Sequence, residues 1–298
     1  MKTTTNKIDH STPVNVYNHF KNVSRFDLAT MYNDGGALRW NTSIDYVDKK
    51  TITEKEKAAR VLHWFKLAAV NYCIMMINSH IELNRDEEIF LQNCIDNSIS
   101  KGTGKMEGIN SISTACFLNE QCKKNAAVPG SICSHCYAFK TLARYRELSR
   151  KLEINTAIFT GCIIPAHMLP RLNDLIFRFE SFGDLRNVIQ VENYFNIVKE
   201  NPRVSFGWWT KNPRFIDEYL KAGNEKPENV RIGVSSLFVN MPIQNKRYSY
   251  FTDFVFTVYS PDYIENNRIE INCGGRHCLT CQNCYRKEGA AIVNEKLK

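Results

Sequence analysis

Three features that would assign this 298-residue sequence to other protein classes are missing. The longest apolar run, residues 67–77, is interrupted by Asn71 and is shorter than the ~20 residues that cross a bilayer, so we expect no membrane span. The stretch from Lys101 to Lys105 lacks the G-x-x-x-x-G-K-S/T frame of a phosphate-binding loop, so we expect it to be a linker. The start of the chain does not read as a secretory signal, which favours the reducing cytoplasm as the compartment.

Size and charge leave a wide choice of folds and partners. With 43% hydrophobic residues, the chain can bury one large core or two small ones, and it falls in the size class of TIM barrels. The net charge of +8 favours a polyanionic partner such as DNA or RNA, although a moderate Lys/Arg excess also occurs in proteins that bind neither. Charge alone therefore does not assign a nucleic-acid partner.

Cysteine, by contrast, is abundant, and its spacing is the strongest chemical signal. Four of the 11 cysteines fall within residues 273–284, separated by four, two and two residues. Such spacing brings thiols close together, where they bind a metal or form disulfides, and a reducing compartment favours metal. The predicted ligands form an upstream set (Cys116, Cys122, Cys133, Cys136) and a C-terminal set (Cys273, Cys278, Cys281, Cys284).

The spacing also bears on which metal is bound. In the C-terminal set, Cys278-x2-Cys281-x2-Cys284 resembles the C-x2-C-x2-C tract of bacterial ferredoxins, which favours an iron–sulfur cluster, 4Fe-4S in type. The upstream set suits either a four-thiolate zinc site or a second cluster. We leave out His135 and His277 as neighbours of ligands. The remaining thiols, Cys73, Cys94 and Cys162, lie in apolar stretches and are predicted to be buried.

The chain divides by pattern into three parts. Residues 1–50 are polar and weakly periodic, so we expect an irregular N-terminal arm. Residues 51–107 form a helical extension, in which Thr53 and Glu56 make a capping box and a second helix, residues 85–99, carries Ile89 and Phe90 on its apolar side. Residues 108–298 are expected to form a barrel-like metal-binding domain.

Within this last part, short strands alternate with helices, which predicts parallel βα units. The expected fold class is α/β, a partial or complete (βα) barrel with cysteine-rich metal-binding loops, and an open doubly wound sheet is the alternative. Strands are predicted at residues 109–114, 175–180, 204–208, 230–234, 254–258 and 269–272, and helices at 137–154, 188–200 and 214–222.

In such folds, chemistry gathers where the strands end. Ser181, Gly183 and Asp184 follow the second predicted strand, Lys211 follows the third and Ser235 the fourth, so we expect all of them near the cysteines. Two of these residues also have a simpler interpretation. Asp184 could cap the next helix, and Lys211 could extend into solvent. Trp208 and Trp209 are adjacent in a strand and should point to opposite sides.

Part of this domain resembles a known enzyme family. The segments FRFESFGDLRN, FGWWTKNPRFIDEYLKAG and VRIGVSS resemble the middle of a radical S-adenosylmethionine (SAM) barrel. In that family the turn after the second strand binds the SAM amino group, and Gly183-Asp184 stands at that place. The resemblance implies that Ser181 and Asp184 hold SAM with Lys211 and Ser235 nearby. The family's usual C-x3-C-x2-C tract is absent.

A longer pattern, ICSHCYAFK, SFGD, WTKNP and CGGRHCLTCQNCY, is similar to a phage family named after gene product eighty-eight. This resemblance spans roughly residues 108–287 and implies a phage protein that works in the host cytoplasm. Together the two resemblances favour an iron–sulfur, radical-SAM-like enzyme that modifies a nucleic acid or a nucleotide-derived substrate. Asp184 and Lys211 are then the candidate catalytic residues.

Two other functions stay open. The chain also resembles tRNA-guanine transglycosylases, including phage relatives that insert 7-deazaguanines into DNA. That resemblance implies Asp184 as a nucleophile and a zinc site in the C-terminal cysteines, although no histidine follows Cys284 as the zinc motif requires. The third possibility is a noncatalytic iron–sulfur protein that binds nucleic acid. The oligomeric state is not predicted.

Overall fold

The computed structural model describes residues 11–24, 27, 53–244, 247–274 and 276–297. It divides the chain into two compact units, Met1–Leu91 and Gln92–Lys298, with the boundary inside helix α4 (Arg85–Asp96). Most of the predicted N-terminal arm lies outside the described residues. Helix α1 (Pro13–Phe20) falls within it, so that part is not irregular as expected.

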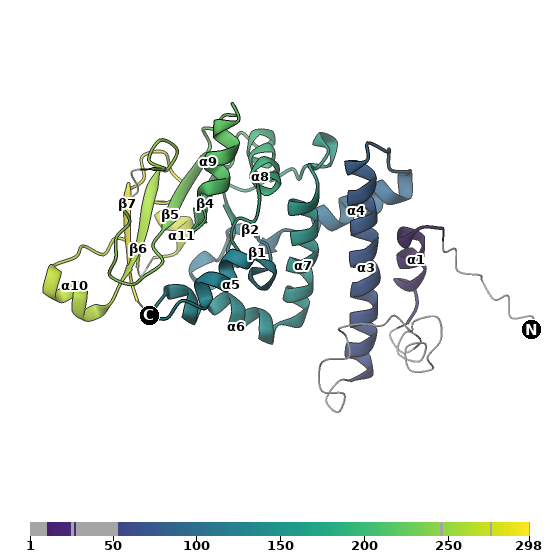
Figure 1. The fold of residues 1–298 in the computed structure, drawn as a ribbon, viewed down its shortest axis with the longest axis horizontal. Helices are drawn as coiled ribbons and strands as arrows, with labels where there is room; N and C mark the ends of the chain where they lie inside the picture. Colours follow the sequence, from purple (N-terminus) through teal and green to yellow (C-terminus); the bar gives the residue numbers. More distant parts are fainter. Residues whose placement is uncertain (1–10, 25–26, 28–52, 245–246, 275, 298) are drawn as a thin grey trace, which may run out of the picture. The chain divides into compact units, whose positions relative to one another are not determined.

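The first unit contains α1, α3 (Glu54–Asn78) and the start of α4 (Figure 1). The Thr53 hydroxyl accepts a hydrogen bond from the Glu56 amide at 3.2 Å, as the predicted helix start requires. Phe20 stacks on Phe65 with ring centroids 4.6 Å apart, which fixes α1 against α3. Ile89, expected on the buried side of α4, is instead exposed.

The second unit is built on a seven-stranded sheet whose strands follow chain order, β1 to β7. Only β1 and β2 are antiparallel, and all later neighbours are parallel. The strands are β1 (Ser100–Lys101), β2 (Asn110–Ile112), β3 (Ile176–Phe179), β4 (Ser205–Thr210), β5 (Val230–Ser235), β6 (Phe254–Tyr259) and β7 (Ile292–Lys296).

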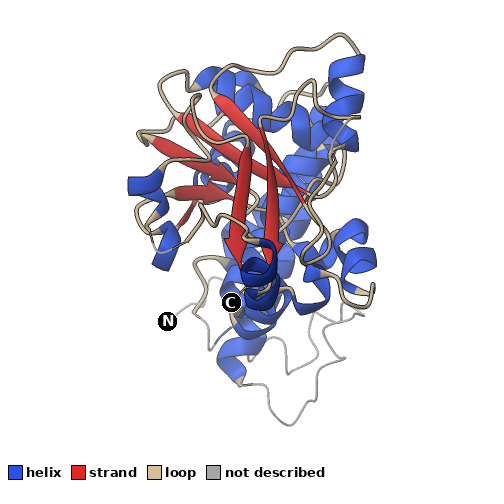
Figure 2. Cartoon of the chain, turned by 90° about the vertical axis from the view of Figure 1, so that its left-hand side faces the viewer, coloured by secondary structure: helices blue, strands red, loops and turns tan. Residues whose placement is uncertain are grey.

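This order decides between the predicted folds. A doubly wound sheet reverses its strand order at a switch point, whereas here each parallel strand lies beside the one that follows it. The order is that of a (βα) barrel, but β1 and β7 lie at opposite edges, so the described strands form an open sheet. The fold is therefore mixed α/β with a mostly parallel, twisted sheet (Figure 2), which does not close into a barrel among the described residues.

The segments of this unit differ from the prediction in two places. The helix expected over residues 137–154 is two helices, because Tyr145 leaves the helical conformation with φ −105° and ψ 84°. The strand expected at residues 269–272 is replaced by a single bridge between Cys273 and Glu295 of β7. The helical segments of this unit are η2 (Gly104–Met106), η3 (Cys116–Leu118), α5 (Glu120–Ala126), η4 (Ile132–His135), α6 (Tyr137–Arg144), α7 (Arg146–Gly161), η5 (Ala166–Met168), α8 (Val188–Glu200), α9 (Arg214–Lys221), α10 (Pro261–Asn267) and α11 (Cys278–Cys281).

The two faces of the sheet have different roles. On the helix-covered face, Trp208 is fully buried and packs edge-on against Tyr194 and Phe195 of α8. On the other face, Trp209 packs against Tyr285, which belongs to the segment after α11. The two tryptophans thus point to opposite sides, as predicted. The C-terminal cysteine segment therefore covers the face that the helices leave open.

No helix in the described ranges has both the length and the hydropathy needed to cross a membrane.

Candidate functional site

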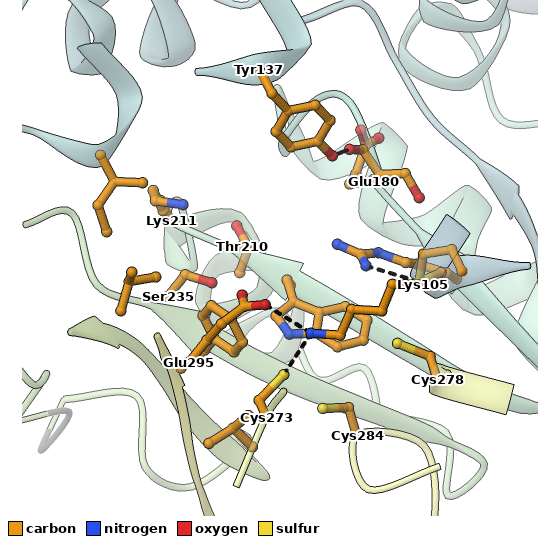
Figure 3. Close-up of a pocket in the computed structure, with 18 of the residues that line it drawn as sticks. Lys105, Tyr137, Glu180, Thr210, Lys211, Ser235, Cys273, Cys278, Cys284 and Glu295 are labelled. Atoms are coloured by element: carbon orange, nitrogen blue, oxygen red, sulfur yellow. Dashed lines mark hydrogen bonds and ion pairs between the residues drawn. The ribbon is translucent and has the colours of Figure 1, made fainter. Parts of the chain in front are cut away.

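Both cysteine sets line a single cavity of about 790 Å³ in the second unit. The predicted strand-end residues Ser181, Gly183, Asp184, Lys211 and Ser235 line the same cavity. Figure 3 shows Lys211, Thr210 and Ser235 on one side of it and Cys273, Cys278 and Cys284 on another. The parallel sheet brings these residues together because its strands end at a common edge.

The upstream set is carried by short helical turns after β2. Cys116 begins η3, Cys122 lies in α5, Cys133 lies in η4 and Cys136 precedes α6. Burial raises the pKa of Cys116 to about 12, and the nearby Cys136 thiol adds to this shift. Burial followed by the charge of Asp184 raises the pKa of Cys122. Both shifts favour the protonated thiol at Cys116 and Cys122 when no cation or metal is bound.

The C-terminal set surrounds the short helix α11, which ends at Gln282 in the left-handed conformation, φ 52°. Burial raises the pKa of Cys278, while the charges of Lys105 and Arg178 oppose the shift. The Lys105 ammonium donates to the Cys273 sulfur at 3.1 Å and pairs with Glu295 at 2.7 Å (Figure 3). Burial opposes the charge of Lys105, yet these two hydrogen bonds leave its pKa raised. Lys105, in the stretch predicted to be a linker, thus lines the cavity.

Glu180 is a central residue that the sequence reading placed only at the end of a strand. It is 4% exposed, has a positive φ of 56°, and follows β3 directly. Its carboxylate accepts hydrogen bonds from Tyr194 (2.5 Å), Gln190 (2.6 Å) and the Thr114 hydroxyl and amide. Burial raises its pKa to about 7, although the Tyr194 hydrogen bond opposes the shift. This network ties α8 to the ends of β2 and β3.

Asp184 joins the ends of β3 and β4. One carboxylate oxygen accepts from the Thr210 hydroxyl and the Leu185 amide, and the other accepts from the Lys211 amide at 2.9 Å. Burial raises its pKa against these hydrogen bonds. Asn187, and not Asp184, caps helix α8. Asp184 therefore holds the Thr210–Lys211 turn in place.

Gly183 leaves no room for a side chain. A Cβ at this position would lie 2.5 Å from both the Glu180 Oε2 and the Thr114 Oγ1 atoms, closer than van der Waals contact allows. Glycine is thus required where the turn after β3 passes the Glu180 network.

Three other predicted residues have simpler surroundings. Ser181 donates its amide to Ser113 at 2.9 Å and accepts from the Tyr137 hydroxyl through its carbonyl. The Lys211 ammonium has no ion-pair or hydrogen-bond partner among the residues that the structure describes. Ser235 ends β5, and the buried hydroxyl of its neighbour Ser236 has no hydrogen-bond partner within the described part of the chain. Lys211 and Ser236 can therefore still bind a ligand.

Two arginines of the open sheet face were not predicted. Arg178 of β3 lies over the Trp209 ring at 4.2 Å and lines the cavity. Arg231 of β5 donates to the carbonyls of Asn283 (2.6 Å) and Gly289 (3.1 Å) and so fixes the segment that carries Cys284. The alternation of side chains along a strand could have placed both arginines on one face of the sheet. The groups that they contact could not be predicted, because these depend on how the distant C-terminal segment packs.

The other cysteine and histidine predictions have mixed outcomes. Cys73, Cys94 and Cys162 are buried, as expected. His135 and His277 are exposed and do not line the cavity. No group of three or more His, Cys, Asp or Glu side chains in the described ranges is arranged to hold a metal ion. The metal-binding role of both cysteine sets stays a prediction.

Comparison with known proteins assigns a family. Neither the curated proteins nor the solved structures include a match to this sequence. The model of the family described as gene product 88 matches residues 47–296, most of the chain and all eight cysteines of the two sets. The chain therefore belongs to the gene product 88 family.

Proposed function

We propose that the protein is an iron–sulfur, radical-SAM-like enzyme that modifies a nucleic acid or a nucleotide-derived substrate. The observation that carries this proposal is the shared cavity, in which two sets of four thiols lie beside the ends of parallel strands. All eight are free cysteines, and thiols are the donors that iron–sulfur clusters use. The donor type therefore suits a cluster, although the thiols of the described ranges are not arranged around a common metal position.

The upstream set is our candidate for the SAM-cleaving cluster. Its members share the cavity with the strand-end turns, and the charges of Asp184 and Lys211 act on Cys133. Cys122, Cys133 and Cys136 would supply three thiolates and leave one iron open. A bound, reduced cluster would supply one electron to break the sulfonium bond of SAM. A four-thiolate cluster or zinc at the C-terminal set would hold structure or pass electrons.

The chain's own residues would bind and orient the ligands. The Lys211 ammonium would pair with the SAM carboxylate, and the hydroxyls of Ser235 and Ser236 would donate nearby. Asp184 holds the Lys211 backbone and so fixes where this cation begins. Asp184 is thus a positioning residue in this proposal, and Ser181, in the same turn after β3, would contribute its hydroxyl.

Asp184 gives less support to the transglycosylase alternative. A nucleophilic carboxylate needs an oxygen lone pair directed at the substrate, and three hydrogen bonds from the protein leave Asp184 one such site, on Oδ2. No other observation favours base exchange over radical chemistry.

The test is SAM cleavage by the anaerobically reconstituted chain with dithionite, measured as 5′-deoxyadenosine. We expect product from the wild type and from Cys162→Ala, and none from Cys133→Ala. Loss of signal in the Cys133 variant alone would assign the reaction to the upstream set. Base exchange without reductant would support the transglycosylase, and nucleic-acid affinity without turnover would support a binding protein.

A further inference from the structure

Arg178 is a cation in the cavity whose hydrogen-bonding capacity is almost unused. Its one hydrogen bond goes from Nη1 to the Met106 sulfur at 3.4 Å, a weak acceptor. Its Nε is buried without a partner, and no carboxylate pairs with it among the residues described by the structure. The side chain is only partly buried, but its buried Nε and its weak Nη1 contact leave most of the guanidinium donors unused, so the site is suited to a negatively charged group.

The cysteines do not account for this cation. Lys105 is the residue that donates to a thiol of the C-terminal set, at 3.1 Å from Cys273. Arg178 donates to no cysteine sulfur in the described ranges, although its charge acts on Cys278 and Cys284. Stacking on Trp209 holds the guanidinium plane in one orientation, which is how a two-pronged oxyanion site is preorganised.

Arg178 is also separate from Lys211, the cation at the strand ends. Arg178 pairs in register with Gly207 of β4, and Lys211 lies four positions after Gly207. Four residues of extended chain span about 13 Å, so the side chains of Arg178 and Lys211 start from well-separated backbone positions. The two cations can therefore bind different groups of one ligand. The cavity, at about 790 Å³, is in the range that holds a nucleotide-sized ligand.

We propose that Arg178 forms an oxyanion-binding site in the cavity, which takes the phosphate or carboxylate of a nucleotide-sized ligand. The guanidinium donates two parallel hydrogen bonds to the anion, while Trp209 supports it from behind. The site uses no metal and therefore does not depend on the function proposed above. It predicts that the ligand of this cavity carries a negative charge.

The experiment is calorimetric titration of the full chain, purified anaerobically, with AMP, SAM and adenosine. AMP presents a phosphate, SAM a carboxylate, and adenosine neither group. We expect one of the two charged probes to bind at least about 10-fold more tightly than adenosine, because hydrogen bonds to charged groups contribute that much. Arg178→Gln should remove this preference, and Arg178→Lys should retain part of it.

Arg203→Gln is the matched control, because it removes the same charge from an exposed residue that does not line the cavity. It should leave the preference intact. A preference for AMP that Arg178→Gln removes would identify a phosphate ligand. A preference for SAM that the same variant removes would place the SAM carboxylate at Arg178 and not at Lys211. Equal binding of all three probes, or a preference that survives in a folded Arg178→Gln chain, would overturn the proposal. Metal loss in Arg178→Gln with unchanged AMP and SAM binding would also overturn it, because the guanidinium would then serve the thiols.

Discussion

The two cysteine sets line the same cavity but differ in the charges that surround them. Around the upstream set, Asp184 and Glu180 are buried carboxylates, and both raise the pKa of Cys122 after the larger effect of burial. Around the C-terminal set, Lys105 contacts Cys273 directly, and Arg178 acts on Cys278 and Cys284. The upstream set thus has two buried carboxylates beside it as well as Lys211, and the C-terminal set has two cations beside it as well as Glu295.

This difference matters because a metal held by four thiolates is anionic. Cations nearby stabilise the thiolate form, whereas buried carboxylates oppose it. We therefore expect the C-terminal set to bind metal more tightly, and the upstream set to hold the more labile centre. A labile centre beside the strand-end turns fits a site where a substrate approaches.

The largest expected effect comes from removing the thiols of one set. The double variant Cys278→Ser/Cys284→Ser should lose the C-terminal metal, and Cys122→Ser/Cys133→Ser should lose the upstream metal. In the wild type, a chelator should remove the upstream metal first. Metal per chain during chelation, measured by mass spectrometry with Cys162→Ala as control, checks this order. If both sets lost their metal at the same rate, the two sets would not differ in metal affinity as we expect.

The carboxylates of the upstream side should show in the pH dependence of stability. Because burial raises the pKa of Glu180 from 4.5 to about 7, the folded chain keeps a proton that the unfolded chain has lost. Stability should therefore fall as the pH rises from about 4.5 to about 7, and Glu180 should contribute about 3 kcal/mol to that fall. Urea unfolding at pH 5 and pH 8 measures it.

Glu180→Gln should remove this part of the pH dependence, because the amide does not titrate. The control Glu288→Gln changes an exposed side chain and should keep the wild-type slope. If the unfolding free energy of Glu180→Gln changed with pH as much as that of the wild type, Glu180 would not take up a proton in this range. It would then carry its negative charge throughout.

Gly183→Ala tests how tightly the same network is packed. The new Cβ would press on Glu180 and on the Thr114 backbone, so we expect a loss of about 1–3 kcal/mol in unfolding free energy. Gly274→Ala, in the C-terminal set, meets its nearest atom at 3.8 Å and should cost less than about 0.5 kcal/mol. Equal losses in chemical denaturation would contradict the close packing beside Glu180.

The smallest effect concerns the cationic side. Lys105→Met removes the contacts with Cys273 and Glu295, which are partly exposed, so stability should fall by about 1 kcal/mol or less. The rate of metal release from the C-terminal set should rise more clearly than stability falls. Lys123→Met, which breaks an exposed pair with Glu120, should change neither. An unchanged rate of metal release in Lys105→Met would show that Lys105 does not stabilise the metal at the C-terminal set.

Local patterns in the sequence were enough to find most of the fold. Helix α8 was predicted with its observed bounds, and Gly223 ends α9 with a φ of 93°, as a helix-ending glycine should. Strand β7 was missed, because only Ile292 and Val293 of its five residues are apolar. The break at Tyr145 was missed because apolar periodicity continues across it.

The site was predictable where chemistry depends on residue type and spacing. The eight cysteines and Asp184 stand out in the sequence, and all line the cavity. Glu180, Arg178 and Lys105 did not stand out, because their roles come from contacts with segments far away in the chain. A charged residue in or next to a buried strand was the available signal, and only the fold identifies its partners.

The most direct measurement is iron, zinc and acid-labile sulfide per chain in anaerobically purified protein, with an absorption spectrum. We expect about four or more irons with an equal amount of sulfide, and a broad visible absorption that bleaches on reduction. Zinc without sulfide would contradict the iron–sulfur assignment and, with it, the radical mechanism.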